Sequence, residues 1–297
     1  RDLSSMQVGQ CKYVILTNQH GGVLNDPILL RVEEDVYWFS LADSDILFWA
    51  HGLAANSDYD VEISEPDVSP LQLQGPKSRD IMVKIFGDEI LDLKYYWFKK
   101  FIHNGVELII SRTGWSSELG YEIFLTDSAH GNDLYNTIMD IGHPMGLKPG
   151  HTSTIRRIEG GMLSYHADMT INTNPLELGM DKFINLDQDF DFIGKDALIN
   201  ISNNGLSRKQ VGIIIEDNPM PGPNTRFWDV IKNSAVIGKV TSAVFSPRLK
   251  QNIGLALVDI KYSNIGEELQ INNGTKILDC KIVKKPFYDP NKSLTKS

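Results

Sequence analysis

The chain has 297 residues, 41% of them hydrophobic, and a formal net charge of -9. The acidic balance argues against nucleic acid as a partner, because a phosphate backbone binds to a basic face. No apolar run reaches the length of a membrane span, so we expect a protein that acts on a small molecule rather than on a membrane.

Residues 1–200 mix strand and helix patterns. Strands are expected at 12–17, 27–32, 36–40, 59–63, 71–74, 95–102, 106–111 and 121–125. Helices are expected at 75–86, 131–141 and 153–163, and another, containing Leu47 and Leu53, is expected after a cap at Asp43 or Ser44. The elements do not alternate strictly between strand and helix, which favours an α+β fold over a doubly wound sheet.

The pattern changes after residue 200, where helical periodicity almost disappears. Residues 203–205 resemble a linker, and short strands are expected at 211–215, 230–231, 235–242, 253–258, 268–271 and 276–283. Such a series predicts a small all-β barrel or sandwich. We therefore expect an α+β region of two interleaved subdomains over 1–200 and a β-barrel domain over 201–297.

Cysteine usage favours a cytoplasmic protein. Cys11 and Cys280 are the two cysteines in the chain, and so few are typical of a reducing compartment, although a disulfide between them stays open. The histidines show no spacing typical of metal ligands, so no metal site is expected. The opening residues resemble the interior of a domain, so we expect an N-terminal portion to be missing. The oligomeric state is open, and a homodimer is one option.

The glycine-rich loop between the strands at 106–111 and 121–125 is the most informative segment. It holds Trp115, and Glu122 follows seven residues later. A carboxylate beside a flat aromatic ring can accept two parallel N–H bonds from a heterocycle such as a pterin. The alternative is a core tryptophan with a surface acid, and Arg112 is by default a solvated charge.

Two other places carry candidate residues. Asn25 and Asp26 follow a Gly-Gly turn, either as hairpin residues or as a strand-end carboxylate facing a cleft. Three consecutive aromatic residues can form a wall against a cation or can alternate between the faces of a strand; they are Tyr95, Tyr96 and Trp97. No nucleophile elbow, phosphate-binding loop or dinucleotide motif is present, which favours a reaction that depends on positioning.

Several segments, in the same order, resemble the glycine-cleavage T-protein (aminomethyltransferase) superfamily over nearly the whole chain. Residues 21–26 resemble its Gly-Gly-x-x-Asp-Asp, and residues 112–123 resemble its Arg-x-Gly-Tyr-x-Gly-Glu-x-Gly-x-Glu-Ile. Further matching segments are 157–161, 165–168, 174–177, 191–197, 238–242 and 245–253.

The resemblance implies a multidomain fold that holds tetrahydrofolate in a channel between three domains. It implies that Glu122 binds the pterin and that Trp115 lines the pocket. The other residues expected to bind the folate are Tyr121, Arg112 and Tyr165.

Departures from the T-protein pattern indicate a branch of the superfamily. Asn25 replaces the first acid of the Asp-Asp pair, and residues 152–154 lack an arginine expected near the folate tail. Segments 22–27, 42–45, 65–70, 74–77 and 112–115 instead resemble bacterial dimethylsulfoniopropionate demethylases. Arg156 and His166 depart from that branch, which has an acid and a glycine there.

The resemblance therefore favours methyl transfer from a sulfonium to N5 of tetrahydrofolate, the methyl acceptor. Asp26, with Asn25, is expected to be catalytic. Residues 95–97 are expected to face the donor, and Lys94 or Lys99 is expected to hold its carboxylate. One alternative is a T-protein-type aminomethyltransferase or N-methyl-amine demethylase. The other is a folate-binding module without catalysis.

Overall fold

The computed structural model describes residues 2–41 and 45–297. The described chain forms two compact units that interleave along the sequence. Unit 1 contains Val14–Asp26 and Ser153–Asn291 together with the first residues, and unit 2 contains Ser4–Tyr13, Pro27–Thr152 and Lys292–Ser297.

The centre of unit 2 is a four-stranded antiparallel sheet in the order β6-β9-β8-β7. Its strands are β6 (Ser69–Gln74), β7 (Phe98–His103), β8 (Val106–Ser111) and β9 (Gly120–Leu125). Every residue of β9 is buried, as expected of a strand covered on both faces. β7 and β8 meet at Asn104 and Gly105, which both have positive φ, as a tight hairpin turn requires.

Different elements cover the two faces of this sheet. Helices α2 (Ser78–Phe86) and α3 (Gly131–Gly142) pack with Tyr121 and Ile123 on one face. On the other face, Ile109 and Phe124 pack with residues of a small sheet in the order β1-β4-β5. Its strands are β1 (Cys11–Tyr13), β4 (Ile28–Arg31) and β5 (Tyr37–Ser40).

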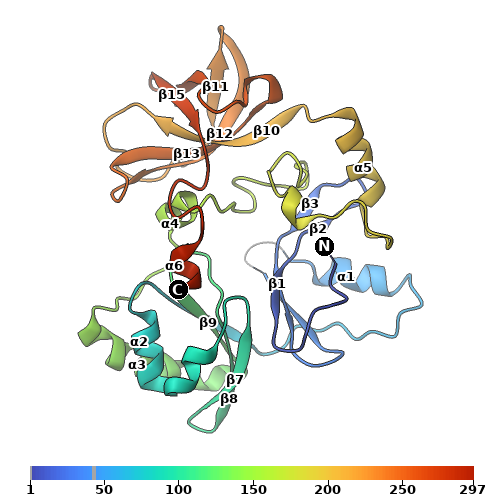
Figure 1. Ribbon diagram of the computed structural model, residues 1–297, viewed down its shortest axis with the longest axis vertical. Helices are drawn as coiled ribbons and strands as arrows, with labels where there is room; N and C mark the ends of the chain where they lie inside the picture. Colours follow the sequence, from blue (N-terminus) through green and yellow to red (C-terminus); the bar gives the residue numbers. More distant parts are fainter. Residues whose placement is uncertain (1, 42–44) are drawn as a thin grey trace. The chain divides into compact units, whose positions relative to one another are not determined.

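The closed six-stranded barrel of unit 1 has the order β10-β13-β12-β11-β14-β15. Figure 1 labels five of these strands, β10 to β13 and β15. Alternate residues such as Ile213 and Ile215 point into its core, where they pack with Val230, Val240 and Ile271. The strands are β10 (Arg208–Ile215), β11 (Trp228–Lys232), β12 (Ala235–Ser246), β13 (Gln251–Asp259), β14 (Glu268–Asn272) and β15 (Ile277–Val283).

The remaining elements are short. Unit 1 also contains β2 (Leu16–Thr17), β3 (Val23–Asn25), α4 (Thr154–Glu159), η4 (Asp181–Phe183), α5 (Lys195–Asn204) and η5 (Ile260–Tyr262). Unit 2 also contains α1 (Leu47–Ala54), η1 (Asp88–Asp92), η2 (Ser128–His130), η3 (His143–Met145) and α6 (Ser293–Lys296).

The α+β class and the C-terminal barrel are confirmed, and several local predictions are wrong. Residues 59–63 form no strand, and the strand expected at 12–17 is split between β1 and β2. The helix expected at 153–163 ends at Glu159 because Gly160 and Gly161 follow, the latter with φ of 64°. The linker expected at 203–205 contains the end of α5. The cap expected at Asp43 or Ser44 lies outside the described residues.

The two units divide the chain differently from the boundary expected at residue 200. Unit 1 joins the barrel to residues 153–204 and to the β2–β3 hairpin. The division into domains 1–200 and 201–297 stays a prediction.

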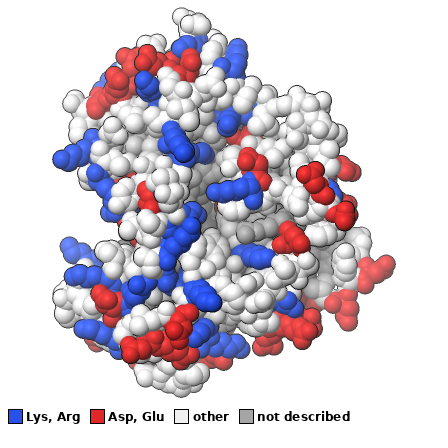
Figure 2. Space-filling model, viewed as in Figure 1, with Lys and Arg blue, Asp and Glu red and all other residues white. Residues whose placement is uncertain are grey.

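Acidic and basic side chains occur together on the face shown in Figure 2. Among the helices in the described parts of the chain, none combines the length and apolarity that crossing a membrane demands.

Candidate active site

Glu122 is a buried acid on β9 whose two oxygens are each held by a side chain. The amide of Gln72, directly opposite on β6, donates to Oε1 over 2.9 Å. The hydroxyl of Thr113 donates to Oε2, and Ser111, opposite on β8, shares a hydrogen bond with Thr113. A carboxylate has about four lone-pair sites, so these two donors leave room for further N–H bonds.

Burial controls the acidity of this carboxyl group. Only 9% of Glu122 is exposed. Burial raises the pKa of the Glu122 carboxyl above its ordinary value, an effect that the hydrogen bonds from Thr113 and Gln72 oppose. A ligand that donates two N–H groups to this carboxylate stabilises the charge that burial disfavours. The residues present therefore fit the amino-pyrimidinone edge of a pterin.

Tyr121 and Arg112 lie on the other face of the sheet. Arg112 follows the last residue of β8, and its guanidinium carbon lies 5.3 Å from the centroid of the Tyr121 ring. Tyr121 is fully buried in the cluster under α2 and α3. Successive strand residues point to opposite faces, so neither side chain shares the surface on which Glu122 lies. The folate-binding roles expected of Tyr121 and Arg112 stay predictions.

Arg112 instead holds the end of the described chain. Its guanidinium donates to the carbonyls of Thr295 over 2.9 Å and Ser297 over 3.1 Å, next to α6. Only 4% of Arg112 is exposed, so its default interpretation as a solvated charge is wrong.

The glycines of the Trp115 loop make room for Gln74. A Cβ on Gly114 would lie 2.4 Å from the nearest atoms of the Gln74 side chain, and a Cβ on Gly120 would lie 2.2 Å from its nearest atom. Ser116 donates a hydrogen bond of 2.6 Å to the same side chain. The loop is thereby fixed on β6, and it presents Trp115 as a half-buried side chain.

Residues 94–97 form a turn rather than the start of a strand. The Trp97 amide donates to the Lys94 carbonyl over 3.0 Å, and Tyr96 has a φ of 62°. Trp97 packs against the helix-side cluster, whereas Tyr96 packs against the cluster of the β1-β4-β5 sheet. The rings of Tyr95 and Tyr96 meet edge to face, with 4.7 Å between their centroids. The three residues together do not form one wall, and Lys94 is exposed.

Unit 1 carries the other candidate residues. Asn25 is the last residue of β3 and is only 1% exposed. Its side-chain oxygen accepts a hydrogen bond of 2.8 Å from the backbone amide of Asp26. Burial raises the pKa of the Tyr165 phenol, and the charge of the Asp26 carboxylate adds to this effect. The Tyr165 hydroxyl donates to the Val23 carbonyl over 3.1 Å.

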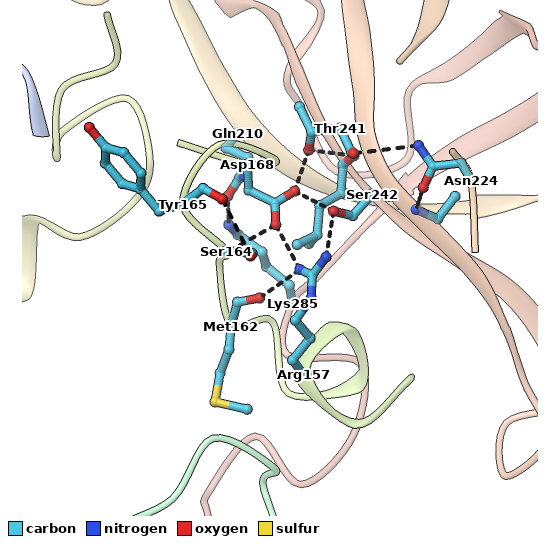
Figure 3. A network of polar contacts seen from close by, with 12 residues as sticks. Arg157, Met162, Ser164, Tyr165, Asp168, Gln210, Asn224, Thr241, Ser242 and Lys285 are labelled. Atoms are coloured by element: carbon cyan, nitrogen blue, oxygen red, sulfur yellow. Dashed lines mark hydrogen bonds and ion pairs between the residues drawn. The ribbon is translucent and has the colours of Figure 1, made fainter. Parts of the chain in front are cut away.

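A buried polar network lies beside Tyr165 (Figure 3). The Asp168 carboxylate pairs with Arg157 at 2.7 Å, and both side chains are almost fully buried. Arg157 is therefore a buried charge with a charged partner. Thr241 and Ser242 on β12 donate to Asp168 over 2.5 Å and 2.7 Å.

Lys285 belongs to the same region and donates to Gln210 Oε1 over 2.7 Å. Burial lowers the pKa of the Lys285 amine to about 8, an effect that the nearby Asp168 carboxylate opposes.

Sequence reasoning missed the partners of Glu122. Gln72 and Thr113 are ordinary polar residues, and their roles depend on the pairing of β6 with β9, which no local pattern specifies. Arg157 and Asp168 are found in motifs, but their pairing depends on the fold of the turn between them.

Comparisons with known proteins place the chain in a family. Residues 1–188 match the model of the GCVT N-terminal domain, and residues 208–289 match that of the glycine cleavage T-protein C-terminal barrel domain. The chain is 37% identical over 271 residues to a dimethylsulfoniopropionate demethylase of Ruegeria pomeroyi, covering 91% of this chain and 73% of that protein.

Aminomethyltransferases are nearly as similar. One from Thermoanaerobacter sp. is 33% identical over 297 residues, covering 98% of this chain and 79% of that protein. The crystal structure of the aminomethyltransferase T of the Bartonella henselae glycine cleavage system has the same fold. It matches with a TM-score of 0.84 and 22% identity, over 98% of this chain and 79% of that one. The chain belongs to the glycine-cleavage T-protein family of one-carbon transferases.

Proposed function

We propose that the chain is a tetrahydrofolate-dependent demethylase that moves a methyl group from a small sulfonium compound, of the dimethylsulfoniopropionate type, to N5 of tetrahydrofolate. The family and the 37% identity to a dimethylsulfoniopropionate demethylase support this proposal. Tetrahydrofolate acts in it as the methyl acceptor, and therefore as a substrate.

Glu122 is the residue proposed to hold the pterin. Its carboxylate is buried, it accepts one bond at each oxygen, and a bidentate N–H pair complements its remaining lone pairs. Trp115 is proposed to line the same pocket because it lies in the loop that follows Thr113. Asp26 and Tyr165 belong to unit 1, and their roles rest on the arrangement within that unit.

Asn25 is the observation that favours a sulfonium donor. Where the T-protein pattern has two consecutive acids, this chain has a buried neutral amide that hydrogen-bonds the backbone of Asp26. Releasing a methylene group from an amine carrier requires proton transfer to the departing amine. A thioether leaves as a neutral molecule and requires no such acid.

The proposed step is one in-line displacement. The N5 lone pair forms the new bond to the methyl carbon, the carbon–sulfur bond breaks, and its electron pair stays on sulfur as the neutral thioether. The proton of N5 passes to Asp26, directly or through water. Because a sulfonium methyl is already electrophilic, alignment is the main task, and orientation can contribute about 7–11 kcal/mol.

A second candidate is an aminomethyltransferase or an N-methyl-amine demethylase. The 33% identity to the Thermoanaerobacter aminomethyltransferase favours it. The two candidates differ in the oxidation state of the transferred carbon. The amine reaction forms methylene-tetrahydrofolate, whereas the sulfonium reaction forms methyl-tetrahydrofolate.

The discriminating experiment is a donor screen on the protein with tetrahydrofolate, read by mass spectrometry of the folate. Sulfonium, quaternary ammonium and N-methyl-amine donors are compared at equal concentration. The proposal predicts 5-methyl-tetrahydrofolate from the sulfonium alone. Methylene-tetrahydrofolate from an amine donor supports the second candidate, and folate binding without turnover of any donor supports a non-catalytic folate module.

A further inference from the structure

The turn at residues 164–169 is tied to the barrel by Asp168. This carboxylate accepts hydrogen bonds from Arg157, from the Ser164 amide, and from Thr241 and Ser242 on β12. Figure 3 shows these four donors converging on one side chain. Asp168 is 2% exposed, so the turn cannot move relative to β12 without breaking several buried, charge-assisted bonds.

Residues 165–173, which begin in this turn, also hold β3 in position. The Tyr165 hydroxyl donates to the Val23 carbonyl over 3.1 Å, and the Val23 amide donates to the Thr173 carbonyl over 2.8 Å. A Cβ on Gly22 would lie 1.9 Å from the Ile171 carbonyl oxygen, so the two segments are in direct backbone contact. Both main-chain groups of Val23 are thus held by residues 165–173.

Asp26 is the residue that follows β3, so the bonds that hold Val23 also limit where Asp26 can lie. We propose that Tyr165 is a positioning residue for Asp26, and that the tether from Asp168 to β12 holds Tyr165 in its place. This inference rests on the proposed function, in which Asp26 takes the proton of N5. It differs from the expectation that Tyr165 binds the folate directly.

The physical reason is the precision that an in-line transfer needs. A displacement of about 1 Å in a reacting group can cost about 10²-fold in rate. Tyr165 fixes β3 through one carbonyl, so removing its hydroxyl frees the strand end without removing any group that contacts the folate.

The first test is a double-mutant cycle between Tyr165→Phe and Asp26→Asn. We expect Tyr165→Phe to lower kcat about tenfold and to leave the Kd for tetrahydrofolate within about twofold. In the Asp26→Asn background the same change should alter kcat by less than about twofold. A raised Kd with unchanged kcat would mean that Tyr165 binds folate directly. If the two reductions in kcat multiply in the double variant, Tyr165 and Asp26 act independently. A raised Kd with unchanged kcat, or multiplying reductions in kcat, overturns the inference.

The second test needs no turnover, so it separates this inference from the proposed function. Amide hydrogen exchange is measured in the wild type, in Tyr165→Phe and in Asp168→Asn, with Ser242→Ala as a milder tether variant. Exchange should rise at β3 in all three variants and stay unchanged at β14. Asp217→Asn, which alters an exposed ion pair with Lys276 on the barrel, is the matched control.

Unchanged exchange at β3 in Tyr165→Phe contradicts the inference even when the enzyme turns over. Absence of methyl-tetrahydrofolate from the wild type defeats the proposed function alone, since the exchange experiment still decides whether Tyr165 and Asp168 locate β3.

Discussion

Glu122 on β9 and Gln72 on β6 lie directly opposite each other, and the Gln72 amide donates to the Glu122 carboxylate over 2.9 Å. With Thr113 on the other oxygen, this pairing fixes the orientation of a buried acid before any ligand arrives. A carboxylate held in this way can act as a preorganised receptor for two parallel N–H groups.

Replacing Glu122 by Gln is expected to weaken tetrahydrofolate binding by about 10- to 100-fold, because hydrogen bonds to a charged group contribute about 1.5–3 kcal/mol. Isothermal titration measures the change. Glu107→Gln is the control, since Glu107 lies on the same sheet in an exposed pair with Lys100. Equal affinities in the wild type and the Glu122 variant would exclude this residue as the pterin receptor.

Folate affinity should depend on pH through Glu122. Its pKa is raised by burial, so binding through the ionised carboxylate weakens as the pH falls through a value above the ordinary glutamate pKa of about 4.3. Glu122→Gln should remove this dependence.

The free energy of unfolding should depend on pH in the opposite direction to folate affinity. A raised native pKa makes ionisation easier in the unfolded chain, so wild-type stability falls as the pH rises through the same window. Chemical denaturation at several pH values, for the wild type and Glu122→Gln, measures this. Identical pH profiles for the two proteins would show that the carboxyl is not perturbed.

Asp26→Asn is expected to lower kcat by about 10²- to 10⁴-fold, the usual contribution of a positioned acid or base. Folate affinity should be retained, because Glu122 is the proposed pterin receptor. The control is Asp229→Asn on an exposed position of β11, which should keep full activity. If Asp26→Asn changed affinity and left kcat intact, its role as a proton acceptor would have to be abandoned.

Gly22→Ala should destabilise the fold by about 1–3 kcal/mol, because its Cβ would overlap the Ile171 carbonyl oxygen at 1.9 Å. Gly52→Ala is the matched control, since Gly52 lies in α1 with no atom within 4 Å of the added Cβ. That change should be neutral or stabilising by about 0.5–1 kcal/mol. Urea denaturation compares the two, and equal midpoints would mean that β3 adapts to the added methyl group.

The sequence predicted the barrel and the two strands that pair as β7 and β8, because these depend on local signals. Strand periodicity and the Asn104-Gly105 turn are visible in the residues themselves. Local patterns and the resemblance together supplied Glu122, Trp115 and Asp26 as candidates. It could not show that Tyr121 and Arg112 point to the opposite face from Glu122, since this depends on strand pairing and on alternation along β9.

The aromatic residues at 95–97 illustrate the same limit. A strand was the natural expectation for three consecutive aromatic residues. Tyr96 instead adopts a positive φ in a turn, and the side chains separate between two clusters. The buried pair of Arg157 and Asp168 was equally hidden, because its other partners, Thr241 and Ser242, come from β12, more than 70 residues along the chain from Asp168.

The most direct test supplies dimethylsulfoniopropionate with ¹³C-labelled S-methyl groups and tetrahydrofolate to the protein and follows the label by mass spectrometry. The account predicts one labelled methyl on N5 of tetrahydrofolate for each labelled thioether released, and loss of this product in Asp26→Asn. Release of thioether with unlabelled folate, or label found as methylene-tetrahydrofolate, would contradict methyl transfer from a sulfonium.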